Sequence, residues 1–418
     1  MIRRVVVTGM SGVTAFGNDW ASIEPKLRAC ENATQYMPSY EQYEGLNTKL
    51  AAPIMGFTLP SHYKRKQVRG MGRVSQLATV ATENALLQAG LIGHEVLTNG
   101  QTGIAYGSST GSTDAIGAFG VMLNEKTTRA ITATTYVQMM PHTAAVNVGL
   151  FFGLKGRVIP TSSACTSGSQ AIGYAYEAIK HGYQTVMVAG GGEELCPTES
   201  AVFDTLFATS LKNDQPKTTP RPYDTQRDGL VIGEGAGTLV LEEYEHAIAR
   251  GAIIHAEIIG FASNCDAAHV TQPQMDTMQI CMEMALRDAN LNADKIDYVS
   301  AHGTATDRGD IAESHATANA LGKVPISSLK SYFGHTLGAC GAVEAWLGLE
   351  MMRSGWFNPT LNLDNIDPQC GDLDYITGTG RELDVQYLMS NNFAFGGINT
   401  SIIFKKFSEQ SHKKPLLK

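Results

Sequence analysis

Residues 158–169 read VIPTSSACTSGS, and the order of residue types in this stretch indicates how the chain folds. The apolar start predicts a strand, the small residues predict a sharp turn, and a segment with helical periodicity begins at Ser169. Cys165 would then lie at the N-terminus of that helix, where the helix dipole and unpaired N–H groups favour thiolate over thiol and can stabilise an oxyanion. We therefore expect Cys165 to be a nucleophile, with a buried structural cysteine as the alternative.

Strands and helices alternate on both sides of this stretch. Short apolar runs that end in glycine-rich turns predict strands at residues 5–7, 103–106, 186–188 and 238–241. Longer segments with helical periodicity lie between them, at residues 74–89, 169–181 and 243–250. This alternation predicts an α/β protein whose sheets are largely buried.

The second half of the chain repeats the same plan, although its sequence identity to the first half is slight. Strands are expected at residues 254–259, 298–301, 325–328 and 388–391, and helices at residues 275–289 and 341–353. One strand–turn–helix element holds Cys165 and another holds His335, which predicts an internal duplication. We expect one half at residues 1–251, the other at residues 252–408, and a polar, frayed tail at residues 409–418.

The composition excludes several classes of protein. With 418 residues, of which 43% are apolar and 17% charged, the chain can bury a large core and does not have the composition of a disordered protein. A net charge of −8 argues against a general nucleic-acid binder. The seven scattered cysteines include no C-x-x-C pair, which argues against a disulfide framework. We find no apolar window of about 18 residues and no signal peptide, so we expect a cytoplasmic protein without a membrane span.

Two further segments carry candidate catalytic histidines. The segment HGTATDRGDIAE starts at His302, and the segment KSYFGH ends at His335. A lone histidine is usually a hydrogen-bonded core residue, but both of these are expected in turns where a side chain can face a cleft. Cys165, His302 and His335 are more than 30 residues apart and include no short chelating pair, so we expect no metal site.

Together, four ordered motifs resemble those of the β-ketoacyl-acyl-carrier-protein synthases of the thiolase superfamily, in the branch of synthases I and II. They are A-C-T-S-G at residues 164–168, H-G-T-x-T-x-x-G-D-x-x-E at 302–313, K-S-x-x-G-H at 330–335 and N-x-F-x-F-G-G-x-N at 391–399. The resemblance covers nearly the whole chain and implies a thiolase-like, duplicated α-β-α-β-α fold of five layers. Thiolases carry a second cysteine where this chain has Phe395, and type III synthases replace one histidine by asparagine.

The resemblance implies a ping-pong condensation with no intrinsic cofactor. Cys165 would take an acyl group from an acyl-carrier protein, and the backbone N–H groups of Cys165 and Phe395 would form the oxyanion hole. His302 and His335 would stabilise the enolate that forms when a malonyl-carrier thioester loses CO₂. The resemblance also implies supporting residues: Lys330 orients the histidines with Glu344 as its partner, Glu313 is structural, Phe395 gates the site, and Thr304 and Thr306 contact the phosphopantetheine arm.

Two positions depart from the family pattern and bear on the substrate. Thr110 stands where fatty-acid enzymes often carry a bulky aliphatic residue that limits the acyl pocket, and Leu230 replaces a phenylalanine in the Arg-Asp-Gly-Phe turn. These changes indicate a specialised acyl chain. The local sequence most resembles ketosynthases of aryl-polyene pathways, and the alternative is a housekeeping enzyme of fatty-acid elongation of the synthase II type.

The resemblance implies two protein partners, an acyl-carrier protein and a second subunit. The second subunit would be either an identical chain or a chain-length-factor-like one. Acyl-carrier proteins are acidic, so a run of basic residues that continues to Arg73 is a candidate docking surface, with a solvated helix face as the alternative. This basic patch is defined as Lys64, Arg65, Lys66 and Arg69, together with Arg129.

Two other classes of function are alternatives to a synthase. A Cys–His hydrolase would explain Cys165 and one histidine, but neither the second histidine nor Lys330. A catalytically silent partner subunit would lack the cysteine that this chain has. The synthase therefore accounts for more of the motif residues than either rival.

Overall fold

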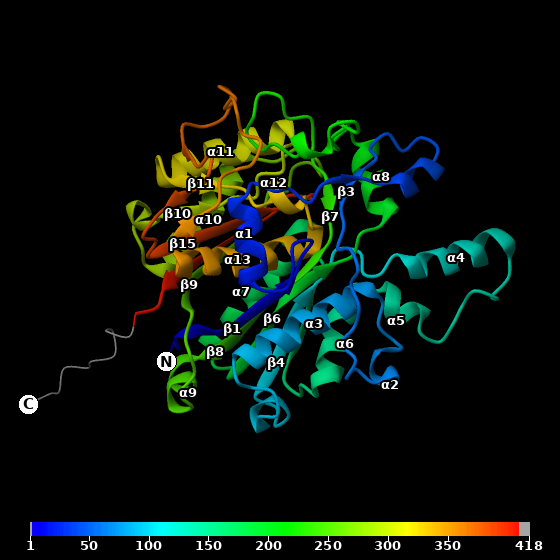
Figure 1. The fold of residues 1–418 in the computed structure, drawn as a ribbon. Coiled ribbons are helices and arrows are strands. Elements are labelled where there is room, and N and C mark those ends of the chain that lie inside the picture. The colour runs from blue at the N-terminus through cyan, green and yellow to red at the C-terminus, as the bar shows by residue number, and fades with distance from the viewer. Residues whose placement is uncertain (1, 409–418) are drawn as a thin grey trace, which may run out of the picture.

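The computed structural model describes residues 2–408, in which helices cover and separate the two halves of a large mixed sheet (Figure 1). The tail expected at residues 409–418 lies outside the described residues. Among the helices formed by residues 2–408, none is long and apolar enough to cross a membrane.

Eleven strands pair side by side in the described part of the chain, in the order β13-β11-β10-β15-β16-β9-β1-β8-β6-β4-β5. The first half supplies β1 (Val5–Val13), β4 (Thr102–Gly107), β5 (Val158–Thr161), β6 (Val186–Glu193) and β8 (Gly235–Glu243). The second half supplies β9 (Ala256–Cys265), β10 (Tyr298–Ser300), β11 (Pro325–Ser327), β13 (Asp374–Tyr375), β15 (Tyr387–Phe393) and β16 (Ile398–Lys406). All strands expected from the sequence are present, and β13 and β16 are additional.

The strand order repeats between the halves of the chain. The order β5-β4-β6-β8-β1 in the first half corresponds to β11-β10-β15-β16-β9 in the second. In each set the first three strands run parallel to one another. The fourth strand is antiparallel to the third, and the fifth is antiparallel to the fourth. A short antiparallel pairing of β1 with β9, which includes Val5 opposite Ile258, joins the two sets. The predicted duplication is therefore confirmed, whereas the division between residues 251 and 252 stays a prediction.

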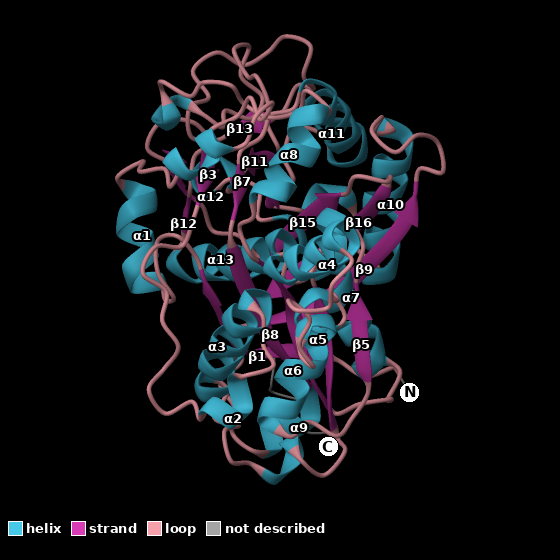
Figure 2. Ribbon diagram, turned by 90° about the vertical axis from the view of Figure 1, so that its right-hand side faces the viewer, coloured by secondary structure: helices cyan, strands magenta, loops and turns pink. Residues whose placement is uncertain are grey.

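The helices complete five layers (Figures 1 and 2). In the middle layer, α7 (Ser167–Lys180) and α13 (Cys340–Ser354) pack on each other and contact strands of both half-sheets. The outer layers are α3 (Arg73–Gln88) with α6 (Thr143–Phe152) on one half-sheet, and α10 (Met275–Ala289) with α11 (Asp307–Leu321) on the other. Because α13 is enclosed on all sides, every residue from Cys340 to Met352 is buried.

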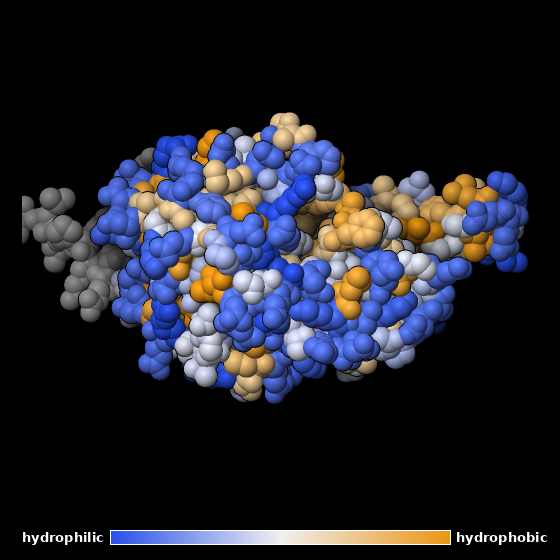
Figure 3. Space-filling view, turned by 90° about the horizontal axis from the view of Figure 1, so that it is seen from above, coloured by the Kyte–Doolittle hydropathy of each residue, from blue (hydrophilic) through white to orange (hydrophobic). Residues whose placement is uncertain are grey.

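Shorter elements surround these layers. They are α1 (Trp20–Arg28), β2 (Gln35–Tyr36), β3 (Leu50–Ala52), α2 (Arg65–Val68), α4 (Asp114–Glu125), α5 (Thr135–Met139), α8 (Pro197–Thr205), β7 (Ile232–Gly233), α9 (Tyr244–Ala249), α12 (Lys330–Phe333), β12 (Trp356–Phe357) and β14 (Arg381–Glu382). The arm formed by α4 and α5 extends from the side of the molecule, and α4 buries none of its residues (Figures 1 and 3).

Glycines allow the backbones of the two halves to approach where α7 and α13 begin. A Cβ on Gly191 of β6 would lie 2.4 Å from the carbonyl oxygen of Gly338 and 2.9 Å from Cα of Gly168. Both of those contacts are to backbone atoms, which cannot move aside as the end of a flexible side chain can. Gly191 therefore holds the first half-sheet close to the turn that precedes α13.

We predict that Gly191→Ala destabilises the fold, while the same change at its neighbour Gly192 does not. A Cβ on Gly192 has its nearest neighbour at 3.5 Å, which is an ordinary contact distance. Overpacking at Gly191 should lower the free energy of unfolding by about 1–3 kcal/mol. Denaturant unfolding of both variants measures this difference, and equal stability of the two would contradict the packing argument.

Candidate active site

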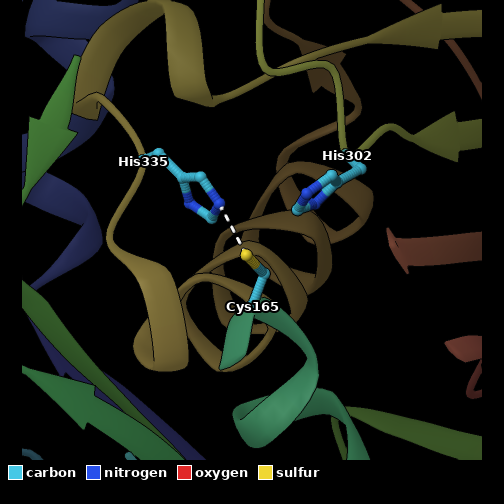
Figure 4. Close-up of side chains that lie close together, drawn as sticks. All are labelled: Cys165, His302 and His335. Carbon is cyan, nitrogen blue, oxygen red and sulfur yellow. Dashed lines mark hydrogen bonds between the residues drawn. The ribbon is translucent and has the colours of Figure 1, made fainter. Parts of the chain in front are cut away.

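Three side chains from distant parts of the chain converge on one buried point, as Figure 4 shows. Cys165 lies in the 3-10 turn η3 (Ala164–Thr166) directly before α7, His302 follows β10, and His335 follows α12. Their sulfur and ring-nitrogen atoms lie within 4.8 Å of one another, and none of the three residues is more than 6% exposed. The closest pair is His335 Nε2 and Cys165 Sγ, which are 3.0 Å apart. The structure thus brings together all three candidates for chemistry.

Both turns that carry the closest pair contain a strained residue. Ala164 has a φ of 51° and Leu337 a φ of 45°, although neither is a glycine. Such a left-handed conformation costs about 1–2 kcal/mol for each residue, so the surrounding packing must hold it. The strain lies one residue before Cys165 and two residues after His335, where it sets the direction of the two side chains.

The hydrogen bonds of His335 determine its tautomer. The backbone N–H of Leu337 donates to Nδ1 of His335 over 3.2 Å, so Nδ1 must be unprotonated. In the neutral ring the proton is then on Nε2, the nitrogen that faces Cys165 Sγ. His335 therefore donates a hydrogen bond at the reaction centre and does not accept the proton of the Cys165 thiol.

The environment of Cys165 differs from the sequence expectation of a favoured thiolate. Burial raises the pKa of the thiol to about 11, although the backbone N–H of Phe395, the charge of Lys330 and the N–H of Cys165 all lower it. The expectation was wrong because it counted the helix N-terminus but not the loss of water around the sulfur. The two backbone N–H groups expected to form an oxyanion hole do both lie against the sulfur.

His302 is held by groups that the sequence motifs only partly indicate. Its ring lies edge-on to that of His335, with centroids 5.2 Å apart. Asn392 Nδ2 lies 3.5 Å from His302 Nδ1 and donates to Glu344 Oε2 over 2.7 Å. Burial and the charge of Lys330 move the pKa of both histidines well below its usual range. Both imidazoles are therefore neutral at physiological pH.

Two buried acids fix the positions of the lysine and of the His302 turn. Lys330 Nζ lies 2.5 Å from Glu344 Oε1, and both side chains are nearly inaccessible. Burial opposes the charge of Lys330, but Glu344 outweighs it and raises the pKa of the amine. Glu313 accepts the backbone N–H groups of His302 and Gly303, each over 2.7 Å, while burial raises its pKa to about 7. These contacts hold the Lys330 amine and the backbone at His302 in fixed positions.

A cavity of about 510 Å³ leads to the three side chains. Thr304, Thr306, Leu230 and Phe395 line it, as do Cys165 and both histidines. Phe207, which is 92% exposed, stands at its apolar mouth. Figure 3 views the molecule from the side of α8 and α11 and shows the surface hollowed beside apolar side chains. The cavity can therefore receive a long, largely apolar substrate.

Thr110 lies elsewhere than the sequence analysis expected. It is exposed on the surface of the chain and does not line the cavity. Its hydroxyl lies 2.9 Å from Glu199 and 3.1 Å from Glu193, two buried acids. Because Thr110 does not line this cavity, its role in limiting the acyl pocket stays a prediction.

The basic patch divides into exposed and paired residues. Lys64, Arg65, Lys66 and Arg69 are exposed on and beside α2, whereas Arg129 pairs with Glu125 of α4. Arg73, the expected continuation, is partly buried in an ion pair with Glu234. In both ribbon views α2 lies near the bottom, and α8 and α11, which border the cavity, lie near the top (Figures 1 and 2). The patch does not flank the cavity of its own chain.

The cluster of one thiol and two imidazoles has the donor types of a soft-metal site. A metal would require the deprotonated thiol, and the raised pKa of Cys165 opposes this. The positive charge of buried Lys330 acts on all three donors and opposes a cation as well. The absence of a metal stays a prediction, and we interpret the cluster as a set of proton donors around a nucleophile.

Sequence reasoning missed three buried residues near the nucleophile. Asn392 occupies an unspecified position of the motif at residues 391–399, and Cys340 lies in none of the four motifs. The Cys340 thiol donates to the carbonyl oxygen of Cys165 over 3.2 Å. Glu193 ends β6 and accepts the N–H of Gly338 in the turn after His335. The strand expected at residues 186–188 ends before Glu193, so no sequence signal drew attention to this residue.

Comparison with known proteins identifies the family. A model of the N-terminal domain of β-ketoacyl synthases matches residues 2–247, and one of the C-terminal domain matches residues 255–364. The 3-oxoacyl-[acyl-carrier-protein] synthase 2 of Vibrio harveyi is 39% identical over 97% of this chain and 99% of its own. A β-ketoacyl synthase structure from Burkholderia phymatum STM815 is 60% identical, with a TM-score of 0.96 over 97% of this chain and 100% of that one. The structure of the ishigamide ketosynthase/chain length factor is 29% identical, with a TM-score of 0.89 over 98% of this chain and 100% of that one. The chain belongs to the β-ketoacyl synthase family.

Proposed function

We propose that this chain is a β-ketoacyl-acyl-carrier-protein synthase that condenses a malonyl-carrier thioester with an acyl group held on Cys165. The observation that carries the proposal is the contact of Cys165 Sγ with Nε2 of a neutral His335, beside a second neutral histidine. A hydrolase of the Cys–His type needs a histidine that accepts the thiol proton. The tautomer of His335 instead supplies a donor, which suits enolate stabilisation.

The first half-reaction transfers the acyl group to the enzyme. The sulfur of Cys165 attacks the thioester carbonyl, and the backbone N–H groups of Cys165 and Phe395 stabilise the oxyanion. When the tetrahedral intermediate collapses, the carrier sulfur leaves and takes up the proton that the Cys165 thiol has lost. The products are an acyl thioester on Cys165 and a free carrier thiol.

The second half-reaction forms the carbon–carbon bond. The bond between the malonyl carboxylate and the methylene carbon breaks, CO₂ leaves, and the electron pair forms an enolate. The N–H groups of His302 and His335 donate to the enolate oxygen and could each contribute about 2.7–4 kcal/mol of transition-state stabilisation. The enolate carbon attacks the acyl carbonyl on Cys165, and the released thiolate takes a proton from solvent.

No resident cofactor takes part in this proposal. Nucleophile, oxyanion donors and enolate donors are all supplied by Cys165, Phe395, His302 and His335. Lys330 acts through its charge: it keeps both histidines neutral and is itself held by Glu344. Thr304 and Thr306, whose hydroxyls lie 2.8 Å apart on the cavity wall, contact the phosphopantetheine arm in this proposal.

The acyl chain in this proposal belongs to a specialised pathway of the aryl-polyene kind. Of the two departures from the family pattern, Leu230 supports this assignment because it lines the cavity, whereas Thr110 does not. A leucine in place of a phenylalanine leaves more room beside the chain. Housekeeping elongation of the synthase II type is the alternative, and the relationship to the Vibrio harveyi enzyme favours it. A cytoplasmic location stays a prediction under both.

A second subunit completes the assembly in this proposal, and it is an identical chain or a chain-length-factor-like one. Strand β5 lies at the edge of the sheet, and Val158 on it is 47% exposed. An uncovered edge strand is normally paired or protected, and antiparallel pairing of two β5 strands would satisfy it. The neighbouring arm exposes several apolar side chains that a partner could bury: Ile116, Met122, Leu123, Tyr136 and Val137.

Acylation and condensation can be tested separately on the purified chain. Incubation with an acyl-carrier thioester should add one acyl group to Cys165, detected by intact mass, and Cys165→Ala should show none. His302→Ala and His335→Ala should each reduce condensation by about 10²–10³-fold, because each removes one donor to the enolate.

The controls decide between the alternatives. Release of free acid without condensation would favour the hydrolase, and the absence of an adduct on Cys165 would defeat the synthase proposal. Running the assay with saturated, unsaturated and aryl-enoyl primers tests the pathway, since a preference for saturated chains would favour housekeeping elongation.

Docking of the carrier on the basic patch predicts an effect that depends on the carrier. Arg69→Glu should raise the KM for carrier-bound thioesters but not for small thioesters, because reversing a rim charge slows association with an acidic partner. Lys295, which is 57% exposed and does not belong to the patch, provides the matched control Lys295→Glu. Equal effects of Arg69→Glu on both classes of substrate would argue against docking.

Pairing of β5 strands predicts that Val158→Asp weakens the assembly. Pairing of the two edge strands would take the introduced carboxylate out of water without a counter-charge, which is unfavourable. Ile253→Asp is the control, since Ile253 is an exposed apolar residue far along the chain from β5. Sedimentation should show a dimer for the wild type and the control but dissociation for Val158→Asp. An unchanged dimer would reject this interface, and a wild-type monomer would favour the chain-length-factor-like partner.

A further inference from the structure

Two buried acids that the proposed reaction does not use share one hydroxyl. Glu193 at the end of β6 is 0% exposed, and Glu199 on α8 is 4% exposed. Thr110 Oγ1 lies 3.1 Å from Glu193 Oε1 and 2.9 Å from Glu199 Oε1. Both distances are hydrogen-bond distances, but a hydroxyl has only one proton to donate. Two carboxylates could share that proton only in a weaker three-centre bond, whereas a protonated carboxyl group that donates to Thr110 gives each contact a proton of its own.

The remaining contacts determine where that proton is. Glu193 accepts further hydrogen bonds from Ser108 Oγ over 2.8 Å, Ser109 N over 2.7 Å, Ser109 Oγ over 2.5 Å, Thr110 N over 3.3 Å and Gly338 N over 2.9 Å. Among residues 2–408, the only hydrogen-bond partner of the Glu199 carboxyl group besides Thr110 is the N–H of Cys196, at 3.4 Å. Burial raises the pKa of Glu193, but the hydrogen bonds from Ser108, Ser109 and Gly338 lower it, so Glu193 is the more stable of the two carboxylates. The proton therefore belongs to Glu199, whose pKa burial and the charge of Glu193 raise well above its usual range.

The donors to Glu193 come from two segments that meet near the nucleophile. Ser108 to Thr110 follow β4, and Gly338 lies in the 3-10 turn η6 (Leu337–Ala339). The residue before Gly338 is Leu337, whose N–H fixes Nδ1 of His335. Glycine is required at position 338 for this hydrogen bond, because a Cβ there would lie only 2.6 Å from Glu193 Oε2. Glu193 thus anchors the turn that sets the tautomer and direction of His335.

We propose that Glu193 is a positioning residue for the condensation: its carboxylate, kept ionised by the proton that Glu199 holds in the Thr110 bridge, fixes the turn that aims His335 at Cys165. This role rests on the proposed synthase function. The charge has a second consequence, since Glu193 disfavours the Cys165 thiolate while Lys330 favours it. In the described part of the chain, the other titratable groups that interact with Glu199 are Glu194, Cys196 and Tyr40.

The location of the proton can be tested without turnover. Glutamine has the shape of protonated glutamic acid, so Glu199→Gln replaces one neutral group by another. The infrared difference spectrum between the wild type and Glu199→Gln should contain the band of a protonated carboxyl group. A carboxylate band in its place would overturn the assignment.

The effect on Cys165 is measured by the pH dependence of its alkylation with iodoacetamide, followed by intact mass. Removal of the anion in Glu193→Gln should lower the thiol pKa, so that alkylation at pH 7.5 becomes about threefold to tenfold faster. The profile of Glu199→Gln should coincide with that of the wild type. Equal shifts in both variants, or no shift in Glu193→Gln, would contradict the proposal.

The positioning role requires a kinetic readout as well. Glu193→Gln should lower the kcat of condensation by about tenfold to a hundredfold, because misplacement of a catalytic group by about 1 Å has effects of that size. The KM for the carrier substrates should stay unchanged. If Glu193→Gln does not fold, Thr110→Val and Thr110→Ser provide a surface pair: the valine variant should lose several-fold in kcat and the serine variant less. Equal kcat in that pair would overturn the role of the bridge.

These results separate the two proposals. Alkylation and infrared spectra report on Glu193 and Glu199 even in an enzyme that condenses nothing. A wild type without acylation or condensation would defeat the synthase function. An active wild type whose Glu193→Gln variant has the same kcat of condensation would defeat only the positioning role.

Discussion

The contact between Cys165 and His335 joins residues that are 170 positions apart, one from each half of the duplicated fold. Its 3.0 Å separation depends on how closely α7 and α13 pack in the middle layer. Glycines make that packing possible: a Cβ on Gly168 would lie 3.0 Å from the carbonyl oxygen of Gly338, and one on Gly341 would lie 2.8 Å from Ser169 N. The high glycine content of the chain therefore has a direct catalytic consequence, because the site exists only where the two backbones touch.

Burial at this interface then decides the protonation states. Burial raises the pKa of the Cys165 thiol and lowers the pKa of both imidazoles, so all three groups are neutral. Lys330 stays charged in the same environment because Glu344 pairs with it. One fixed cation keeps the histidines as donors and lowers the pKa of the thiol without a metal ligand or a general base. In the proposed reaction, the fold thus provides hydrogen bonds to the enolate at the cost of a thiol that is hard to ionise.

Sequence alone could predict the residues that act through local geometry. Cys165, His302 and His335 each follow a strand or a turn with a recognisable pattern, and the repeated strand–turn–helix plan indicated the duplication that the strand order confirms. The failed expectation has a physical cause. The state of the Cys165 thiol depends on what packs around it from distant segments, and no local pattern contains that information. For the same reason the contacts of Thr110 with Glu193 and Glu199 could not be predicted.

Glu193 is a residue whose role sequence alone could not predict. It ends a strand of which only residues 186–188 were predicted, and its importance follows from a hydrogen bond with Gly338, 145 positions away. A carboxylate with so many donors is a stable structural anion, and its desolvation is compensated only if each donor stays in place. Any change that loosens the turn after His335 therefore also leaves the buried Glu193 carboxylate with one hydrogen-bond donor fewer. The geometry of the donor histidine and the ionisation of Glu193 consequently stabilise each other, so the site resists small displacements better than any single hydrogen bond in it would.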